Sequence, residues 1–261
     1  MNDYIIRKKK NKELIQLLLL NPVYQVYSLY VCEVKPEEES VVAINKESQL
    51  IDAILITGMP DLFVAGGYYL TAINEESARA ILDTIKKESN TYISFSIYLE
   101  NAVRSIFPHG DFSTDCIHVY NESNEHKEVK KDYHINSTVV EHLTRELYEH
   151  LEVADVFYEK VTPNDLDPVS KFYCIVVDNK LVAIGEHELE NSVSCGISQV
   201  YTLEEYRGKG YASSIIKHIA QIIKGNNKLP VYHFSMSNIA SKKACEHASF
   251  IDCIKIGYVV I

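Results

Sequence analysis

The chain has 261 residues, of which 46% are hydrophobic and 24% are charged, and its formal net charge at pH 7 is -10. This length gives room for one large domain or two ordinary ones, and the composition is typical of a globular protein in water. The acidic balance argues against nucleic acid as a main partner, because phosphate backbones bind clustered Lys and Arg. It favours cationic partners such as amines.

The cysteines and the N-terminal residues predict a cytoplasmic protein without a membrane segment. The six cysteines contain no CxxC pair, and a chain of this length does not need disulfides, which favours reduced thiols. The stretch RKKKNKELIQLLLLNP begins like a signal peptide, but Gln16 interrupts its leucines and no small-residue cleavage site precedes Pro22. We therefore expect an ordinary first helix there, and no stretch is long enough to span a bilayer.

A very polar stretch, residues 121–134, separates two halves that each alternate strand and helix patterns, so we expect a domain boundary near residue 130. The predicted domains are 1–130 and 131–261. The first half predicts an α/β domain, with helices over 11–20, over 75–88 after an Asn74 cap and up to Phe107, and strands over 41–45, 51–57, 62–65, 92–97 and 116–120. It contains no recognisable catalytic spacing.

The second half predicts a mostly antiparallel sheet with one strand–helix–strand crossover over 196–236, so the fold class is α/β with a mixed sheet (α+β). The expected strands are 172–177, 181–188, 194–203, 230–236 and 250–261, and a turn at 178–180 joins the first two. The expected helices run from a cap at Ser137 or Thr138 to Leu151, from near Gly208 to a C-cap at Gly225, and over 238–249 from an Asn238 cap. The long helix has one apolar face, made of Ala212, Ile215, Ile216, Ile219, Ala220 and Ile223.

The start of the long helix, in the stretch TLEEYRGKGYASS, predicts a site for a phosphate group. The first backbone N–H groups of a helix have no helical partners, and the helix dipole adds partial positive charge. Gly208 and Gly210 would let a pyrophosphate lie directly against these amides, and Arg207 and Lys209 add charge. The P-loop pattern is absent, and Ser213 stands where a Rossmann motif would need its third glycine.

This stretch resembles the acyl-CoA signature of the GNAT superfamily of N-acyltransferases. It reads Arg207-x-x-Gly210-x-Ala212 after a strand that ends VYT, and SMSNIASKKACEHASF follows as the second half of the same fold, so that the resemblance covers about residues 131–261. It implies acetyl-CoA as cosubstrate. The strand residues Val200, Tyr201 and Thr202 would pair with the pantetheine arm, and Arg207, Gly208, Lys209, Gly210, Tyr211, Ala212 and Ser213 would hold the pyrophosphate. Asn238 would touch the pantetheine arm, cap its helix, or do both.

The resemblance also implies an acid and a base for amine transfer. Cys245 stands where members of the family commonly carry a tyrosine that protonates the departing thiolate, and the alternative for Cys245 is a small buried hydrophobic role. No acidic residue occupies the strand that precedes the signature. Glu186 is therefore the predicted base, with its neighbour His187 as the other candidate, whereas Glu204 and Glu205 are expected at the surface.

The sequence thus predicts an acetyl-CoA-dependent N-acetyltransferase that acts on a primary amine by direct attack. The N-terminal half would shape the acceptor site or be a degenerate, GNAT-like partner domain. The alternative is a CoA-binding sensor or assembly module without catalysis, and a weaker third is nucleotide binding. On the helix expected over 138–151, His142, Glu146 and His150 follow at i, i+4 and i+8, but nearby charges favour a solvated helix face over a metal site.

Overall fold

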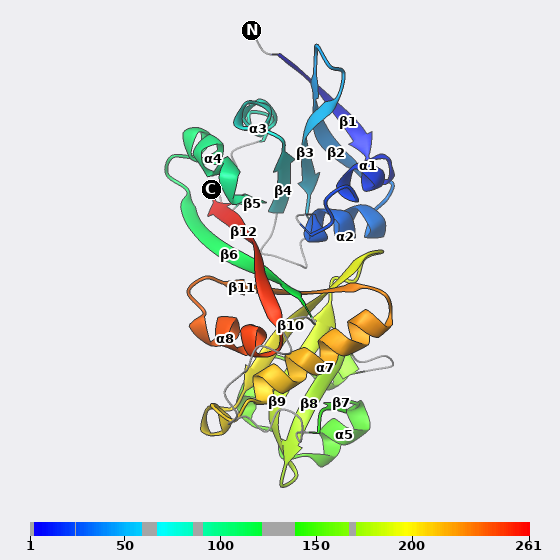
Figure 1. Ribbon diagram of the computed structural model, residues 1–261, viewed down its shortest axis with the longest axis vertical. Helices are drawn as coiled ribbons and strands as arrows, with labels where there is room; N and C mark the ends of the chain where they lie inside the picture. The colour runs from blue at the N-terminus through cyan, green and yellow to red at the C-terminus, as the bar shows by residue number, and fades with distance from the viewer. Residues whose placement is uncertain (1–2, 24, 59–66, 86–90, 122–138, 167–170) are drawn as a thin grey trace. The chain divides into compact units, whose positions relative to one another are not determined.

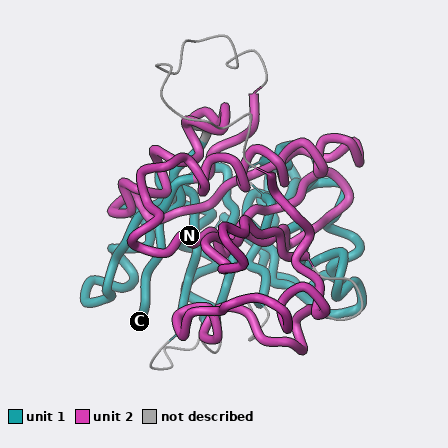
Figure 2. Tube along the Cα trace, turned by 90° about the horizontal axis from the view of Figure 1, so that it is seen from below, with its two compact units in different colours: residues 1–116, 254–261 teal, residues 117–253 magenta. Residues whose placement is uncertain are grey.

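The structure is a computed structural model that describes residues 3–23, 25–58, 67–85, 91–121, 139–166 and 171–261. The chain forms two compact units, which Figure 2 colours separately. Unit 1 comprises residues 1–116 and 254–261, and unit 2 comprises residues 117–253. The boundary expected near residue 130 lies outside the described residues. In the described part of the chain, no helix is both long and apolar enough to cross a membrane.

Unit 1 is a sheet with helices, and its strands follow the order β1-β2-β3-β4-β5-β12. Pairing is antiparallel from β1 to β4 and between β5 and β12, and β4 and β5 are parallel. The elements are β1 (Tyr4–Lys10), α1 (Asn11–Leu18), α2 (Val26–Val34), β2 (Glu39–Asn45), β3 (Ile51–Thr57), β4 (Gly67–Ala72), α3 (Glu75–Leu82), β5 (Tyr92–Ser96), the 3-10 turn η1 (Ile97–Leu99), α4 (Glu100–Ile106), β6 (Asp111–Tyr120) and β12 (Phe250–Val260). β6 continues into unit 2, and β12 enters from it. Leu55, Ile81, Phe95 and Val103 belong to the core of this unit.

Unit 2 is also a sheet with helices, and its strands follow the order β6-β11-β10-β9-β8-β7 (Figure 1). The pairs from β7 to β10 are antiparallel, and β10 and β11 are parallel. The elements are β7 (Glu141–His142), α5 (Arg145–His150), α6 (Asp155–Tyr158), η3 (Pro163–Leu166), β8 (Phe172–Val177), β9 (Lys180–Glu188), β10 (Ser194–Thr202), η4 (Glu204–Tyr206), α7 (Tyr211–Gly225), β11 (Leu229–Ser235) and α8 (Ile239–His247). The mixed α/β fold expected from the sequence is confirmed.

The amphipathic pattern of α7 places the helix on the sheet. Ile215, Ile216, Ile219 and Ile223 are buried, and α7 contacts β8, β9, β10, β11 and α8. Each fully buried isoleucine side chain contributes about 1.5–3 kcal/mol of apolar burial. The helix is therefore fixed along its length, and its first turn has a defined position beside the end of β10.

Several elements differ from the expectation. The helix predicted to reach Leu151 is wrong over Glu141–His142, which pair with β8, and α5 begins after Thr144, whose side chain accepts from the Leu147 amide. Its predicted cap at 137 or 138 lies outside the described residues. The helix predicted over 75–88 ends at Leu82, and residues 86–88 of that prediction also lie outside the described part. Gly225 is the last residue of α7 rather than its cap, and the left-handed residue is Asn227 (φ 58°).

Three elements of unit 1 carry no clear sequence pattern and were not expected. β1 is an edge strand whose lysines reduce its alternation, and Lys8 and Lys10 pair with Glu39 and Glu37. α2 is buried around most of its surface, so its apolar residues show no helical period. β4 follows residues 59–66, and the strand predicted over 62–65 lies outside the described residues.

Candidate functional site

The first turn of α7 presents free backbone donors. Gly210 precedes the helix with φ 83° and Gly208 has φ 77°, conformations that L side chains rarely adopt. No side chain of the described residues caps this helix, and the first helical bond into it is Ser214 N–H to Gly210 O (3.0 Å). The amides of Tyr211, Ala212 and Ser213 therefore remain available to an anion. A Cβ added at Gly208 would meet nothing within 4 Å, so there is open space next to this glycine for a ligand.

The two cations of the signature occupy different positions. The Arg207 Nε donates to the carbonyl oxygen of Thr202 at 3.2 Å, and its guanidinium carbon lies 5.7 Å from the centre of the Tyr201 ring. Arg207 is thus held at the end of β10. Lys209 places its ammonium 4.6 Å from the centre of the Tyr206 ring instead, outside the cavity described below. Of the two cations, only Arg207 lines the cavity beside the start of α7.

β10 separates from β11 beside this helix start. The parallel pairing runs from Ser194 to Ile197, where Ile197 lies opposite Tyr232, and it ends there. In the pairing with β9, the register of β10 shifts between Ser198 and Tyr201, and Gln199 has φ 48°, so a β-bulge follows at once. Residues 200–202 of β10 therefore have no strand partner in β11. That edge can accept an extended ligand as an added strand would.

The separation opens a cavity of about 540 Å³. It is lined by Val200, Tyr201, Thr202, Tyr206, Arg207, Gly208, Gly210, Tyr211, Ala212 and Ser213 on one side and by Tyr232, Asn238, Ala240, Ser241, Lys243, Ala244 and His247 on the other. Nine of the thirteen predicted site residues therefore lie around this space on the first side, and a tenth, Asn238, lies on the second. Lys209, Glu186 and Cys245 do not line it. The Thr202 Oγ1 is buried without a hydrogen-bond partner among the described residues, so a ligand there could satisfy it.

The wall made by α8 went largely unpredicted. Ala240, Lys243, Ala244 and His247 all line the cavity, and their spacing of i, i+3, i+4 and i+7 defines one face of a helix. That period was readable from the sequence, because Asn238 fixes the start of the helix. Asn238 itself accepts a hydrogen bond from the Ser241 amide at 3.0 Å, so its capping role is present in the structure.

Cys245 lies on another face of α8. Its side chain is fully buried, its Sγ donates to the carbonyl oxygen of Lys242 at 3.1 Å, and His118 Nδ1 lies 3.6 Å away. Burial raises the pKa of this thiol to about 12. A thiol in this position neither lines the cavity nor gives up its proton easily, so the structure offers no support for the predicted acid role.

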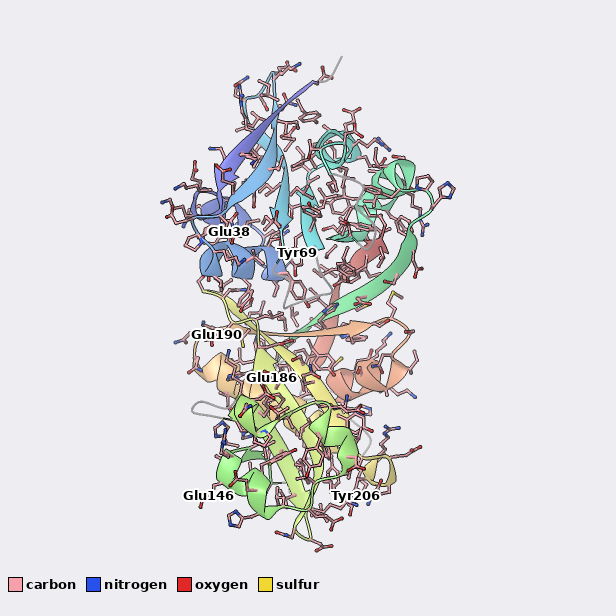
Figure 3. The ribbon with its side chains drawn as sticks, turned by 180° about the vertical axis from the view of Figure 1, so that it is seen from behind. Glu38, Tyr69, Glu146, Glu186, Glu190 and Tyr206 are labelled. Atoms are coloured by element: carbon pink, nitrogen blue, oxygen red, sulfur yellow. The ribbon has the colours of Figure 1, made fainter. Side chains whose placement is uncertain are left out.

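Glu186 lies on the sheet face opposite α7. Ile184 belongs to the core under α5, α6 and η3, and alternation along β9 puts Glu186 on that same face (Figure 3). Its cross-strand partner is Ser198, the residue directly after the last β10–β11 pair. Burial is the main cause that raises the pKa of Glu186 to about 7, and the nearby Glu188 acts in the same direction. The carboxyl thus titrates near neutral pH beside the point where the strands separate.

His187, the other candidate base, faces α7. Its ring lies 6.0 Å from the ring of Tyr173, which also contacts His218 of α7 at 5.4 Å. Burial lowers the pKa of His187, and its Nδ1 is buried without a partner among the described residues. It lies on the opposite side of the sheet from Glu186, as the alternation predicts.

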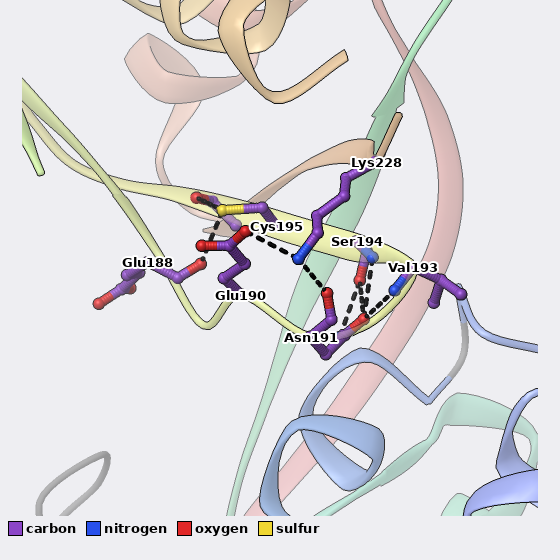
Figure 4. Close-up of polar contacts among 8 residues, drawn as sticks. Glu188, Glu190, Asn191, Val193, Ser194, Cys195 and Lys228 are labelled. Atoms are coloured by element: carbon purple, nitrogen blue, oxygen red, sulfur yellow. Dashed lines mark hydrogen bonds and ion pairs between the residues drawn. The ribbon is translucent and has the colours of Figure 1, made fainter. Parts of the chain in front are cut away.

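A hydrogen-bonded turn holds the β9–β10 pair (Figure 4). The Asn191 side-chain oxygen accepts from the amides of Val193 at 2.9 Å and Ser194 at 2.8 Å. The Lys228 ammonium, just before β11, donates to the backbone oxygen of Asn191 and pairs with Glu190, both at 2.7 Å. This network ties the beginning of β11 to the β9–β10 turn, and so fixes the closed end from which the strands separate.

The histidine stripe does not form. His142 belongs to β7 with its ring 5.4 Å from that of Tyr173, whereas Glu146 and His150 belong to α5, where His150 Nδ1 lies 2.6 Å from the Glu146 backbone oxygen. The expectation of a continuous helix through the three residues is therefore wrong. The described residues contain no group of three or more His, Cys, Asp or Glu placed to hold a metal ion.

Residues 136–250 match the family model described as the acetyltransferase (GNAT) family. A search of curated proteins finds no match. Among solved structures, the chain is similar to an acetyltransferase from the GNAT family of Colwellia psychrerythraea, at 12% identity and a TM-score of 0.55, over 98% of this chain and 99% of that one.

Two further solved structures span both units. A GCN5-related N-acetyltransferase from Sphaerobacter thermophilus is 10% identical with a TM-score of 0.59, over 99% of this chain and 95% of that one. A Drosophila protein is 9% identical with a TM-score of 0.64, over 99% of both chains. At such identities the likeness concerns the fold, and it extends over the whole chain rather than over residues 131–261 alone.

Proposed function

Residues 136–250 of this chain form a GNAT acetyltransferase domain, and from this premise we propose that the protein transfers an acetyl group from acetyl-CoA to a primary amine. The observation that carries the proposal is the cavity between α7 and α8, which combines an uncapped helix start with an unpaired strand edge. An anion and an extended amide-bearing arm are the two parts of CoA that these features fit. The chemistry of each part can be assigned to named residues.

The helix start fits the pyrophosphate. The amides of Tyr211, Ala212 and Ser213 point along the helix dipole, and Arg207 adds a full positive charge beside them. Gly208 and Gly210 leave no Cβ between the amides and a ligand. Lys209 contributes charge to the approach of the anion from its place over Tyr206.

The strand edge fits the pantetheine arm. Val200, Tyr201 and Thr202 have backbone groups without partners on the β11 side, and amides of the arm would complete them as a neighbouring strand does. The buried Oγ1 of Thr202 is available as a further contact. Asn238 lines the opposite wall, where its side chain keeps the start of α8 in place.

Glu186 fits the role of the base. An amine attacks a thioester only as the neutral form, so its proton must pass to an acceptor. The nitrogen forms the new C–N bond, the C–S electron pair leaves on sulfur, and Glu186 takes the proton that the nitrogen loses and returns it to water. A carboxylate whose pKa is about 7 combines enough basicity with a deprotonated form above neutral pH.

The acceptor we propose is a small-molecule or peptide amine. Glu188 and Asp165 both raise the pKa of Glu186, and their negative charge favours a cationic amine on that face. We place the enzyme in the cytoplasm because Cys32, Cys174, Cys195 and Cys245 are buried thiols, as expected in a reducing compartment.

A calorimetric titration with acetyl-CoA tests the proposal. We expect micromolar binding by the wild type and a loss of at least 100-fold in Gly210→Asp, because the side chain is strained at φ 83° and its charge repels a phosphate. Gly225→Asp is the matched control, since it adds the same charge at the far end of α7 with nothing within 4 Å. Absence of binding by the wild type would refute the proposal.

A further inference from the structure

Three histidines surround one buried tyrosine of unit 2 on the sheet face that α7 covers. The ring of Tyr173 lies 5.4 Å from the ring of His142 and 6.0 Å from that of His187. His218 places its ring 5.4 Å from the same tyrosine. We propose that protonation of these four residues, the Tyr173 cluster, loosens α7 from the sheet, so that acid conditions weaken acetyl-CoA binding. The coupling to acetyl-CoA rests on the function proposed above, whereas the loosening of α7 does not.

The Tyr173 cluster joins three strands to the helix that carries the proposed phosphate site. His142 of β7 lies opposite Tyr173 of β8 in the strand pairing, and His187 belongs to β9, the next strand of the sheet. His218 is the member on α7, one position before the buried Ile219. Repulsion between an imidazolium on the sheet and one on the helix would therefore act directly on the packing of α7.

The surroundings of the cluster suit neutral imidazoles. The Nδ1 of His187 is buried without a hydrogen-bond partner among the described residues, so none of them is placed to stabilise a proton at this atom. Lys171 and His142 both oppose a positive charge on His187, whereas Glu190 favours one. Glu190 is already paired with the Lys228 ammonium at 2.7 Å. A charge on His187 would thus have a neighbouring cation and an acid that another cation already engages.

The sign of the pH effect follows from burial. Burial lowers the pKa of both His187 and His218 from the ordinary value of 6.5, so the folded state binds these protons less tightly than the unfolded state does. Stability from the neutral imidazoles is complete above pH 6.5 and is lost as the pH falls through the folded pKa values. Cys195 of β10 acts on Tyr173, but burial raises the pKa of this thiol to about 12, so it supplies no negative charge in this range.

Hydrogen exchange, corrected for the intrinsic pH dependence of amides, measures the loosening without any ligand. Unit 1 is the internal reference, because His109 is its one histidine and the other nine lie in residues 117–253. Between pH 7.5 and 5.0 we expect the protection of wild-type α7 peptides to fall about 10-fold more than that of unit 1 peptides, since two buried imidazoles become charged.

A double variant, His187→Gln with His218→Gln, should remove most of this difference between the units, because neither amide takes up a proton. His150→Gln is the matched control: this histidine is exposed on α5, where its Nδ1 lies 2.6 Å from the Glu146 backbone oxygen, and the variant should behave as the wild type. An equal loss of α7 protection in the wild type and the double variant would overturn the proposal.

Calorimetry with acetyl-CoA at the same two pH values tests the coupling. The phosphates of the ligand also titrate, so the quantity to compare is the ratio of the two dissociation constants in each protein. We expect this ratio to be about 10-fold larger for the wild type than for the double variant, because a loosened α7 no longer presents its first turn to the ligand. Equal ratios would overturn the coupling, even where exchange confirms the loosening.

Failure of this inference differs from failure of the proposed function. If the wild type binds no acetyl-CoA at either pH, the proposed function and the coupling are refuted, and exchange still decides whether α7 loosens. Should the double variant not fold, an NMR titration of the wild-type imidazoles decides, with His218→Gln to assign the signal of that residue. A His218 imidazole that titrates at or above pH 6.5 would overturn the proposal.

Discussion

Unit 1 and unit 2 share one order of elements, and the comparison shows which residues distinguish their possible activities. Apart from short 3-10 turns, the chain up to β6 reads β1-α1-α2-β2-β3-β4-α3-β5-α4-β6, and the rest reads β7-α5-α6-β8-β9-β10-α7-β11-α8-β12, although β6 extends into unit 2 and β12 into unit 1. In each unit one parallel pair, β4–β5 or β10–β11, is connected through a helix. We interpret unit 1 as a second copy of the GNAT-like fold, and the strand registers then match positions between the units.

The helices that connect the parallel strands, α3 in unit 1 and α7 in unit 2, begin differently. Only Ile73 and Asn74 join β4 to α3, whereas residues 203–210 join β10 to α7. Asn74 accepts a hydrogen bond from the Ser77 amide, and Glu75 and Glu76 place negative charge in the first turn of α3. A capped and acidic helix start is a poor site for phosphate. This difference at the helix start explains why we propose CoA binding in unit 2 and not in unit 1.

The last residue pairs of the two parallel strand pairings differ as well. The β4–β5 pairing ends at Leu70–Phe95 and the β10–β11 pairing at Ile197–Tyr232, so Phe95 stands where unit 2 has Tyr232. The cavity beside Leu70 and Phe95 measures about 20 Å³, room for little more than one water molecule. Unit 1 therefore has neither the phenol nor the space at this position.

The residues directly after these last pairs, Thr71 in unit 1 and Ser198 in unit 2, have different cross-strand partners. Thr71 follows Leu70 and lies opposite Ile54, whereas Ser198 follows Ile197 and lies opposite Glu186. Ile54 is 2% exposed, an ordinary core side chain. The carboxyl that we propose as the base is thus replaced in unit 1 by an aliphatic group, and the comparison singles out Glu186 independently of its pKa.

The largest effect that would sharpen this comparison is the loss of the base. We expect Glu186→Gln to lower thiol release from acetyl-CoA, measured with a panel of amines, by about 100- to 1000-fold, with unchanged acetyl-CoA affinity. The wild-type rate should rise with pH through about 7, the pKa of Glu186, and then level off. Glu204→Gln, an exposed change of the same kind, serves as the control. A variant of Glu186 with wild-type turnover would remove the base from the proposal.

The same substitution should change the pH dependence of stability. The folded pKa of Glu186, about 7, exceeds the ordinary glutamate value of 4.5, so the folded state binds this proton more tightly than the unfolded state does. Stability from the protonated carboxyl is complete below about pH 4.5 and is lost as the pH rises through 7. Because Glu186 is partly exposed, we expect Glu186→Gln to raise the free energy of unfolding at pH 8 by about 1–3 kcal/mol. Urea denaturation at pH 5 and 8 measures it, and equal curves at pH 8 would contradict it.

The sequence predicted the helix start better than the rest of the site, and the reason is local. Residues 207–213 and the strand before them bind through backbone groups, and glycines next to a helix reveal such a site without tertiary information. Tyr232 lines the cavity but has no local signal in the sequence, because its place there depends on where β10 and β11 separate. The family pattern points to Cys245, but that side chain is fully buried and does not line the cavity.

An effect of similar size on stability concerns α7, the helix that carries the proposed phosphate site. A Cβ at Gly185 would lie 2.4 Å from Ile215 Cγ2, so α7 packs closer to β9 than an alanine allows. The matching position in unit 1, next to Ile54, is Ala53. We expect Gly185→Ala to reduce the free energy of unfolding by about 1–3 kcal/mol, measured by urea denaturation. Gly225→Ala, with nothing within 4 Å, should be neutral or slightly stabilising, and a similar loss in both variants would argue against close packing.

The smallest effect compares the two asparagine caps. Asn74 and Asn238 each accept a hydrogen bond from the amide three residues on, at 2.8 and 3.0 Å, so alanine at either should cost about 1 kcal/mol of stability in thermal denaturation. Only Asn238 lines the cavity. We therefore expect Asn238→Ala alone to weaken acetyl-CoA binding, by several-fold in calorimetry. Equal affinity in the two variants would reduce Asn238 to a cap, and weaker binding in Asn74→Ala would mean that unit 1 contributes to the CoA site after all.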